Sequence, residues 1–199
     1  MVNLTDILPI AYCNSVDTLQ LTRDLCQKAI DDGIEGDFAE AGVAMGAHCI
    51  VMHEFNRPVW LFDSFQGISE QTAEDVEFTE SWGKKDGNQR KSNGVTVHGI
   101  DQVKEILQRY STLDGYIFQP GWVCDTLPLV SKKQRFAVLR LDVDLYQPYK
   151  ACLKYLYPLL SKGGWLIIDD YHLTGCKQAL DEAVITDFQF VNGIAYKQK

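Results

Sequence analysis

Four aspartates follow two apolar runs of the sequence. Asp142 and Asp144 end the first run, and the adjacent Asp169 and Asp170 end the second. Side chains two residues apart on an extended segment point to the same side, and ligands of open α/β sheets bind beyond the carboxyl ends of the strands. We therefore expect the four carboxylates to converge. Left unpaired they would repel one another, so a cation is expected among them, and oxygen-only ligands favour a hard ion such as Mg²⁺.

A second candidate site precedes the aspartates in the chain. The turn at 40–46 reads Glu-Ala-Gly-Val-Ala-Met-Gly, and its two glycines would let the backbone approach a ligand beside a helix N-terminus. It is not the G-x-G-x-x-G pattern, and a tight turn without a ligand is an equally good interpretation. Asp63 favours the ligand, because an acid about 20 residues after such a loop holds the ribose hydroxyls of nucleotides in such folds. The alternative for Asp63 is a helix cap or a surface turn.

A few other residues are weaker candidates. Trp122 and Tyr146 could wall a substrate pocket, although an aromatic beside a strand end is more often packing. His172 is the histidine that lies near the aspartates in sequence, two residues after Asp170. Loops build substrate pockets, here the amino-terminal segment and residues 66–95, and loop sequences report pocket shape poorly.

These residues need a sheet to bring them together, and the sequence predicts one. Strands are predicted at 37–43, 59–63, 116–119, 136–141 and 165–168. Helices are predicted at 17–32, 101–110, 148–160 and 176–183, and a further helix follows the strand at 37–43 and runs through residue 53. The runs 188–191 and 194–197, joined by Asn192 and Gly193, predict a closing hairpin.

This order of elements predicts an α/β fold with a doubly wound, mostly parallel, seven-stranded sheet and a C-terminal antiparallel hairpin. Such a hairpin is unusual in dinucleotide-binding Rossmann domains and usual in class I methyltransferases, whose cofactor is S-adenosylmethionine. An NAD-dependent oxidoreductase is therefore disfavoured, also because the G-x-G-x-x-G pattern is missing.

Length and composition predict one globular domain over residues 1–199, since 46% of the residues are hydrophobic and 23% charged. It would comprise an N-terminal helical segment, 1–35, and a polar stretch at 68–95 that we expect to be a mobile lid. The net charge of −8 argues against nucleic acid as a partner. The start lacks a basic leader, and no apolar run could cross a membrane, so a cytoplasmic protein is expected. Six widely spaced cysteines are expected to be reduced.

Five segments resemble the macrocin O-methyltransferase (TylF-like) family, in sequence and in order. They are GDFAEAGV at 36–43, VWLFDSFQG at 59–67, GWVCDTLP at 121–128, LRLDVDLY at 139–146 and LYPLLSKGGWLIIDDY at 156–171. The resemblance implies Mg²⁺-dependent methyl transfer from S-adenosylmethionine to a sugar hydroxyl of an antibiotic or related natural product. The partner would be a small-molecule hydroxyl acceptor, and a homo-oligomer is left open.

The resemblance also assigns roles to individual residues. It implies a metal bound by Asp142, Asp169 and Asp170, with Asp144 as the general base. It implies a cofactor site made of Glu40, Ala41, Gly42, Gly46, Asp63 and Ser64. The sequence departs from the family at Val143, where a glycine is usual, at 44–48, which lacks an extra glycine, and in a shorter segment before the first strand.

Two other functions compete with this one. A catechol-type O-methyltransferase also binds Mg²⁺ at this sheet edge, but its ligand set resembles Asp and Asp-Asn with a lysine near the first ligand. Here the pair is Asp169 and Asp170, and no lysine follows Asp142 until Lys150. A binding module that has lost its chemistry is the other alternative, and such a module has no reason to keep four mutually repelling aspartates.

Overall fold

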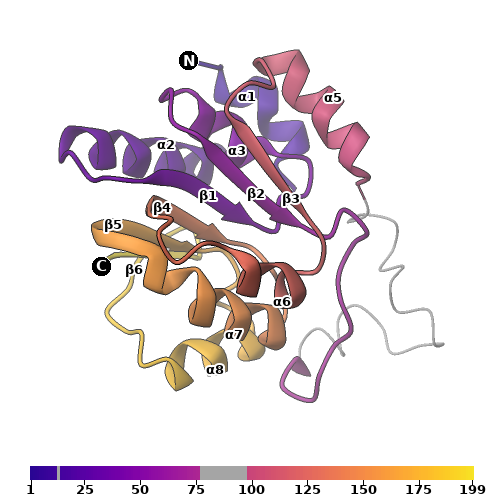
Figure 1. The fold of residues 1–199 in the computed structure, drawn as a ribbon, viewed down its shortest axis with the longest axis vertical. Helices are drawn as coiled ribbons and strands as arrows, with labels where there is room; N and C mark the ends of the chain where they lie inside the picture. Colours follow the sequence, from indigo (N-terminus) through magenta and orange to yellow (C-terminus); the bar gives the residue numbers. More distant parts are fainter. Residues whose placement is uncertain (13, 77–97) are drawn as a thin grey trace.

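The computed structural model describes residues 1–12, 14–76 and 98–199. In this part of the chain seven strands form one sheet in the order β3-β2-β1-β4-β5-β7-β6 (Figure 1). Strands β1 to β5 are parallel to their neighbours among them, whereas β7 pairs antiparallel with β5, and β6 antiparallel with β7. The predicted α/β fold with its closing hairpin is confirmed. The strands are β1 Asp37–Ala41, β2 Val59–Asp63, β3 Tyr116–Pro120, β4 Phe136–Leu141, β5 Leu160–Ile168, β6 Gln189–Val191 and β7 Ile194–Gln198.

Helices cover both faces of the sheet (Figure 1). On one face lie α1 Leu4–Ile7, α2 Val16–Asp31, α3 Ala47–His53 and α5 Ile100–Tyr110. On the other face lie α6 Val123–Thr126, α7 Tyr146–Tyr155 and α8 Thr174–Glu182. Short 3₁₀ turns occupy Leu8–Ile10, Leu127–Leu129 and Tyr157–Leu159.

The two faces of the sheet carry separate hydrophobic cores. Along β1, Phe38 packs in the core under α2 and α3, whereas its neighbour Ala39 packs in the core under α7 and α8. Successive side chains of a strand point to opposite faces, so a strand covered on both sides is apolar throughout. This explains the nearly continuous apolar runs of β4 and β5, and it leaves the ends of the strands as the place for polar chemistry.

The structure corrects the boundary between α7 and β5. We predicted one helix over 148–160 that stops at Gly163, but α7 ends at Tyr155 and β5 already begins at Leu160. Pro158 explains the early end, because its ring lacks an N–H and disfavours helical backbone before it. Gly164 then lies inside β5, where the pairing with β4 shifts register and a Cβ would lie 2.9 Å from a backbone oxygen of β4. The glycine marks a bulge in the strand.

Part of the predicted lid lies outside the described residues. Residues 68–76 of the stretch 68–95 are described, and the remainder from 77 onward is not. Among the described helices, none combines the length and the apolar composition that a membrane span requires.

Candidate active site

A cavity of about 270 Å³ opens at the carboxyl ends of the parallel strands. The loops after all five parallel strands contribute to its lining, and Gly42, Ser64, Trp122, Asp144 and Asp170 follow β1 to β5 in that order. Convergence of loops at this edge is the general property of open α/β sheets on which the sequence argument relied. The cavity is therefore bordered by residues from all five parallel strand ends.

The structure brings most of the predicted site residues to this cavity. Seven of them line it: Gly42, Asp63, Ser64, Asp142, Asp144, Asp169 and Asp170. The other three do not: Glu40 is 2% exposed, Ala41 is fully buried, and Gly46 is the N-cap of α3, where a Cβ would lie 2.8 Å from the side chain of Leu107 in α5. These three residues lie at the end of β1 and the start of α3, and they do not line the cavity.

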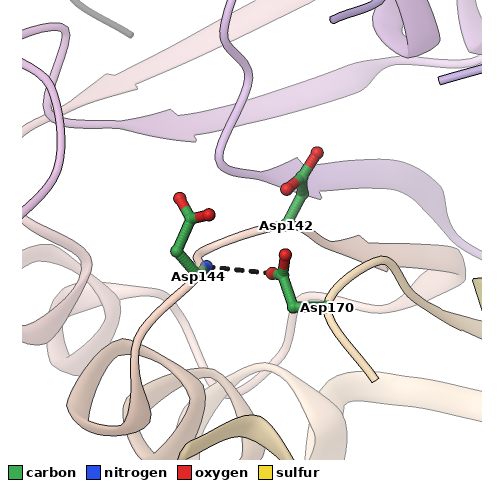
Figure 2. A group of neighbouring side chains, drawn as sticks. All are labelled: Asp142, Asp144 and Asp170. Carbon is green, nitrogen blue, oxygen red and sulfur yellow. Dashed lines mark hydrogen bonds between the residues drawn. The ribbon is translucent and has the colours of Figure 1, made fainter. Parts of the chain in front are cut away.

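Three carboxylates lie close enough together to share a cation. Asp142, Asp144 and Asp170 each offer an oxygen within 4.8 Å of the others (Figure 2). One oxygen of Asp170 is held by the protein, because Oδ2 accepts the amide N–H of Asp144 at 2.9 Å and the hydroxyl of Tyr149 at 2.8 Å. The other oxygen, Oδ1, is then available to a ligand. Asp169, which we predicted as a metal ligand, is not in this group.

Arg140 of β4 is the residue of the site that the sequence analysis missed. Its side chain is 1% exposed, and its guanidinium ion-pairs with three carboxylates: Nη1 lies 2.8 Å from Glu40 and 2.8 Å from Asp142, and Nη2 pairs with Asp169. The premise that the carboxylates are unpaired is therefore wrong for Asp142 and Asp169. The available signal was a lone arginine within an apolar strand, since a buried charge requires partners.

Burial shifts the proton affinity of the acidic groups. It raises the pKa values of Asp144 and Asp170 well above the usual range for aspartate, and neighbouring carboxylates raise them further. Burial also raises the pKa of Glu40 and of Asp169 to about 7, against the opposing effect of Arg140. Glu40 and Asp169 can therefore exchange protons near neutral pH, and a cation bound at the carboxylates would compete with protons there.

Asp144 is held in an unusual backbone conformation. Its φ is +57°, and the amide of Leu145 donates to the carbonyl oxygen of Val143 at only 2.6 Å, which makes a tight three-residue turn around Asp144. Aspartate enters left-handed backbone more readily than most residues, yet such positions store strain and gather at functional sites. Val143 itself has no positive φ. A branched residue is thus tolerated where the family usually has glycine.

Gly42 is required by the protein backbone as well as by any ligand. Its φ is +81°, and a Cβ at this position would lie 1.6 Å from the carbonyl oxygen of Asp142. The loop after β1 therefore passes directly against the end of β4. This contact fixes the distance between the predicted cofactor loop and the carboxylates.

Asp63 ties two loops together at the cavity. Its Oδ2 accepts the amide N–H of Val43 at 2.7 Å, and its Oδ1 accepts the amide N–H of Phe65 at 2.7 Å. The structural alternative weighed for Asp63, a turn-stabilising carboxylate, is thus present in the structure. The residue also lines the cavity, so its predicted contact with a ribose remains compatible with its position.

Asp63→Ala should weaken binding of S-adenosylhomocysteine about 10- to 100-fold and also lower the free energy of unfolding. Loss of a charged acceptor costs roughly 1.5–3 kcal/mol, and 1.4 kcal/mol corresponds to tenfold in affinity. Calorimetric titration and urea unfolding measure the two effects. Asp37→Ala is the matched control, because Asp37 accepts hydrogen bonds from Trp60 and Gln134 at the opposite end of the sheet. It should lower stability alone, and equal affinity losses in both variants would contradict a cofactor contact.

The outer wall of the cavity comes from the amino-terminal segment and from the loops after β2 and β5. Tyr12, Ile68 and His172 line it there. The Tyr12 hydroxyl lies 2.8 Å from Nε2 of His98. Of the two aromatics that we predicted as wall candidates, Trp122 lines the cavity and Tyr146 does not. No local sequence pattern marks these wall residues, because tertiary packing brings them together.

Comparison with known proteins identifies a family and individual proteins to which this sequence is similar. The sequence model of the macrocin-O-methyltransferase (TylF) family matches residues 12–195. The chain is 35% identical to the 8-demethyl-8-(2,3-dimethoxy-alpha-L-rhamnosyl)-tetracenomycin-C 4'-O-methyltransferase of Streptomyces olivaceus, over 92% of this chain and 66% of that protein. It is 36% identical to the demethyldecarbamoylnovobiocin O-methyltransferase of Streptomyces niveus, over 84% and 65%. It is 35% identical to the mycinamicin III 3''-O-methyltransferase of Micromonospora griseorubida, over 78% and 63%. The chain thus spans slightly less than two thirds of the length of these relatives.

Solved structures agree with the fold. The structure of the O-methyltransferase NovP superimposes with a TM-score of 0.81 at 31% identity, over 93% of this chain and 80% of that one. The calicheamicin methyltransferase CalS11 superimposes with a TM-score of 0.70 at 21% identity, over 98% and 89%. At that identity the second match supports the fold alone.

Proposed function

Because the chain belongs to the macrocin O-methyltransferase (TylF) family, we propose that it transfers the methyl group of S-adenosylmethionine to a hydroxyl of a small, glycosylated molecule. The observation that carries this proposal is a cavity lined both by Gly42 and Asp63 and by the cluster of aspartates. The names of two relatives specify methylation at a 4' or a 3'' position, and one of these names includes a rhamnosyl group. We propose that this chain methylates an acceptor of the same kind.

The proposed cofactor would lie against Gly42, Asp63 and Ser64, which line the cavity after β1 and β2. Glu40, Ala41 and Gly46 would support this wall from behind. S-adenosylmethionine, when bound, supplies an electrophilic methyl group on a sulfonium. The residues of this chain orient it: Asp63 offers a carboxylate at the strand end where ribose hydroxyls are held in such folds.

The aspartates fit a hard divalent cation, for which we propose Mg²⁺. All ligand atoms offered are carboxylate oxygens, and those of Asp142, Asp144 and Asp170 lie within 4.8 Å of one another. We propose Asp142, Asp169 and Asp170 as ligands. Asp169 lies outside the group of three, and it would use the oxygen that does not pair with Arg140. A bound cation of this kind lowers the pKa of an acceptor hydroxyl.

Asp144 is proposed as the general base. As the methyl group leaves sulfur and the C–O bond forms, the hydroxyl proton must leave the acceptor oxygen, and the Asp144 carboxylate accepts it. Burial and the neighbouring carboxylates raise the pKa of Asp144, which makes its carboxylate a stronger base than an ordinary aspartate. Asp144 follows the end of β4, and its amide N–H donates to Asp170. The turn around Asp144 thus keeps its side chain beside Asp170 (Figure 2).

A screen of methyl acceptors tests the proposed function. Sugars and glycosides are offered with S-adenosylmethionine, and release of S-adenosylhomocysteine is measured. Turnover with glycosides and none with their aglycones is expected. Turnover with catechols instead would support the catechol-type alternative. Cofactor binding without turnover on any acceptor would support a non-catalytic binding protein.

Binding of Mg²⁺ should be measurable as a change in melting temperature without a methyl acceptor. Mg²⁺ at about 100 times its dissociation constant should stabilise the fold by about 2.7 kcal/mol, which raises the melting temperature by roughly 5–10 °C. EDTA should remove this shift together with turnover.

Variants of the aspartates assign the ligands, and Asp170→Asn should abolish the shift in melting temperature. Asp114→Asn, at an exposed carboxylate just before β3, is the control that keeps it. The same titration on Asp169→Asn and Asp144→Asn tells which of the two is a ligand. An Mg²⁺ shift of zero in the unmodified protein would remove the metal from the proposal.

A further inference from the structure

Asp75 links two parts of the chain that both border the cavity. It is 3% exposed and belongs to the segment that follows β2. Its Oδ1 accepts the amide N–H of Tyr146 at 2.7 Å, and its Oδ2 accepts the amide of Thr72 at 2.8 Å and the hydroxyl of Thr72 at 3.1 Å. Tyr146 is the first residue of α7, whose N-cap residue Leu145 makes no side-chain cap. Asp75 therefore caps this helix from 71 residues earlier in the chain.

The same segment is also fitted against the start of α8. A Cβ added at Gly175 would lie 2.3 Å from Oδ1 of Asp75 and 3.1 Å from Cβ of Tyr146. The hydroxyl of Thr174 donates to the backbone oxygen of Glu74 at 3.1 Å. Glycine at 175 thus leaves the space that the Asp75 carboxylate occupies between the two helix starts. Any larger residue there would displace it.

Both ends of this link concern the cavity. Tyr146 lies two residues after Asp144, so the bond from its amide holds the strained turn that presents the Asp144 carboxylate. On the other side, residues 67–69 of the same segment line the cavity wall. We propose that Asp75 is a positioning residue for methyl transfer, which holds the Asp144 turn and the acceptor-side wall in one fixed arrangement. This inference rests on the proposed function.

The physical basis is the precision that the reaction requires. A turn with positive φ at a non-glycine residue persists when its surroundings hold it, and Asp75 supplies a buried, charged acceptor for that purpose. Displacement of a reacting group by about 1 Å can cost about 100-fold in rate. Asp75 does not line the cavity, so it acts through Asp144 and the wall rather than by contact with the reacting atoms.

Asp75→Ala and Gly175→Ala test this link from its two sides, and each keeps Asp144 intact. Both variants should lower kcat and raise the KM of the acceptor, so that kcat/KM falls about 10- to 100-fold, while the affinity for S-adenosylhomocysteine stays within about threefold. Hydrogen exchange of the Tyr146 amide, followed by NMR, should become at least about tenfold faster. Asp101→Ala is the matched control: it removes an exposed acid from the first turn of α5 and should change none of these quantities.

Two results would overturn the proposal. Unchanged protection of the Tyr146 amide in Asp75→Ala would show that the carboxylate does not hold the helix start, and this measurement needs no acceptor. Faster exchange with unchanged kinetics in both variants would reduce Asp75 to a helix cap. Failure of the proposed function is seen separately, as absence of turnover in the unmodified protein, in which case the exchange result still decides whether Asp75 holds the Asp144 turn.

Discussion

Asp144→Asn should lower kcat by about 10²- to 10⁴-fold, the usual effect of losing a general base, while the affinities for cofactor and Mg²⁺ change little. An alcohol is a poor nucleophile toward a sulfonium methyl group, so its proton must be taken as the new bond forms. The amide of asparagine has almost the shape of the carboxylate but no useful basicity. Single-turnover rates of methyl transfer, together with titrations of both ligands, measure the effect.

The local structure makes this substitution unusually clean. Asparagine, like aspartate, tolerates left-handed backbone, and the bond between the Asp144 amide and Asp170 does not involve the replaced side chain. Loss of Mg²⁺ binding in the variant would make Asp144 a ligand, as its place within 4.8 Å of the Asp142 and Asp170 oxygens allows. Normal turnover would place the base elsewhere, and His172 in the cavity wall would be tested next.

Arg140→Met should destabilise the protein by about 3–5 kcal/mol, because it removes one partner of a buried ion-pair network and leaves the others uncompensated. Glu40, Asp142 and Asp169 all depend on this guanidinium. Urea unfolding of the metal-free protein gives the difference. Arg135→Met is the matched control, since Arg135 is exposed, precedes the same strand and donates from its side chain only to backbone oxygens among the described residues. Its effect should stay near 0.5 kcal/mol.

The pH dependence separates loss of charge compensation from loss of packing. Glu40 and Asp169 have pKa values of about 7 in the folded protein, above their values in an unfolded chain. Groups with raised pKa values stabilise the fold less as the pH rises from the unfolded value through the folded one. Without Arg140 the pKa values of Glu40 and Asp169 in the folded protein rise further. The loss of unfolding free energy in Arg140→Met should therefore be smallest near pH 5 and grow toward pH 8. A deficit that is constant with pH would indicate lost packing instead.

Periodicity and the order of the elements were sufficient to predict the sheet and the edge at which the candidate site lies. The alternation of apolar runs with amphipathic helices gave the order of the elements, and Asn192 with Gly193 correctly marked the turn between β6 and β7. Asp144 joins the cluster through a turn with positive φ beyond the end of β4, which the strand period of two does not describe. The convergence of Asp142 and Asp170 follows from a local rule, the meeting of strand ends at one edge of the sheet. Such local rules need no knowledge of tertiary contacts.

Local sequence rules could not predict which residues these side chains pair with. Arg140 reaches Glu40 from 100 residues away, and the bond from Tyr146 to Asp75 spans 71 residues. A period or a motif indicates which face a side chain takes, but not which neighbour it meets on the adjacent strand. Pairing of this kind depends on the register between β1 and β4, where Glu40 lies opposite Arg140. That register is a tertiary property, and it decides which carboxylates are compensated.

The carboxylates around Arg140 outnumber its single positive charge, and this surplus bears on how a methyl transferase would exchange its cofactor. Glu40, Asp142 and Asp169 share the guanidinium, while Asp144 and Asp170 add further acidic groups at the cavity. S-adenosylmethionine carries a sulfonium charge that S-adenosylhomocysteine has lost. When these carboxylates are ionised and hold no cation, their negative field would attract the spent cofactor less than the fresh one. The acidic site would thus favour release of the product by the same electrostatics that draw in the methyl donor.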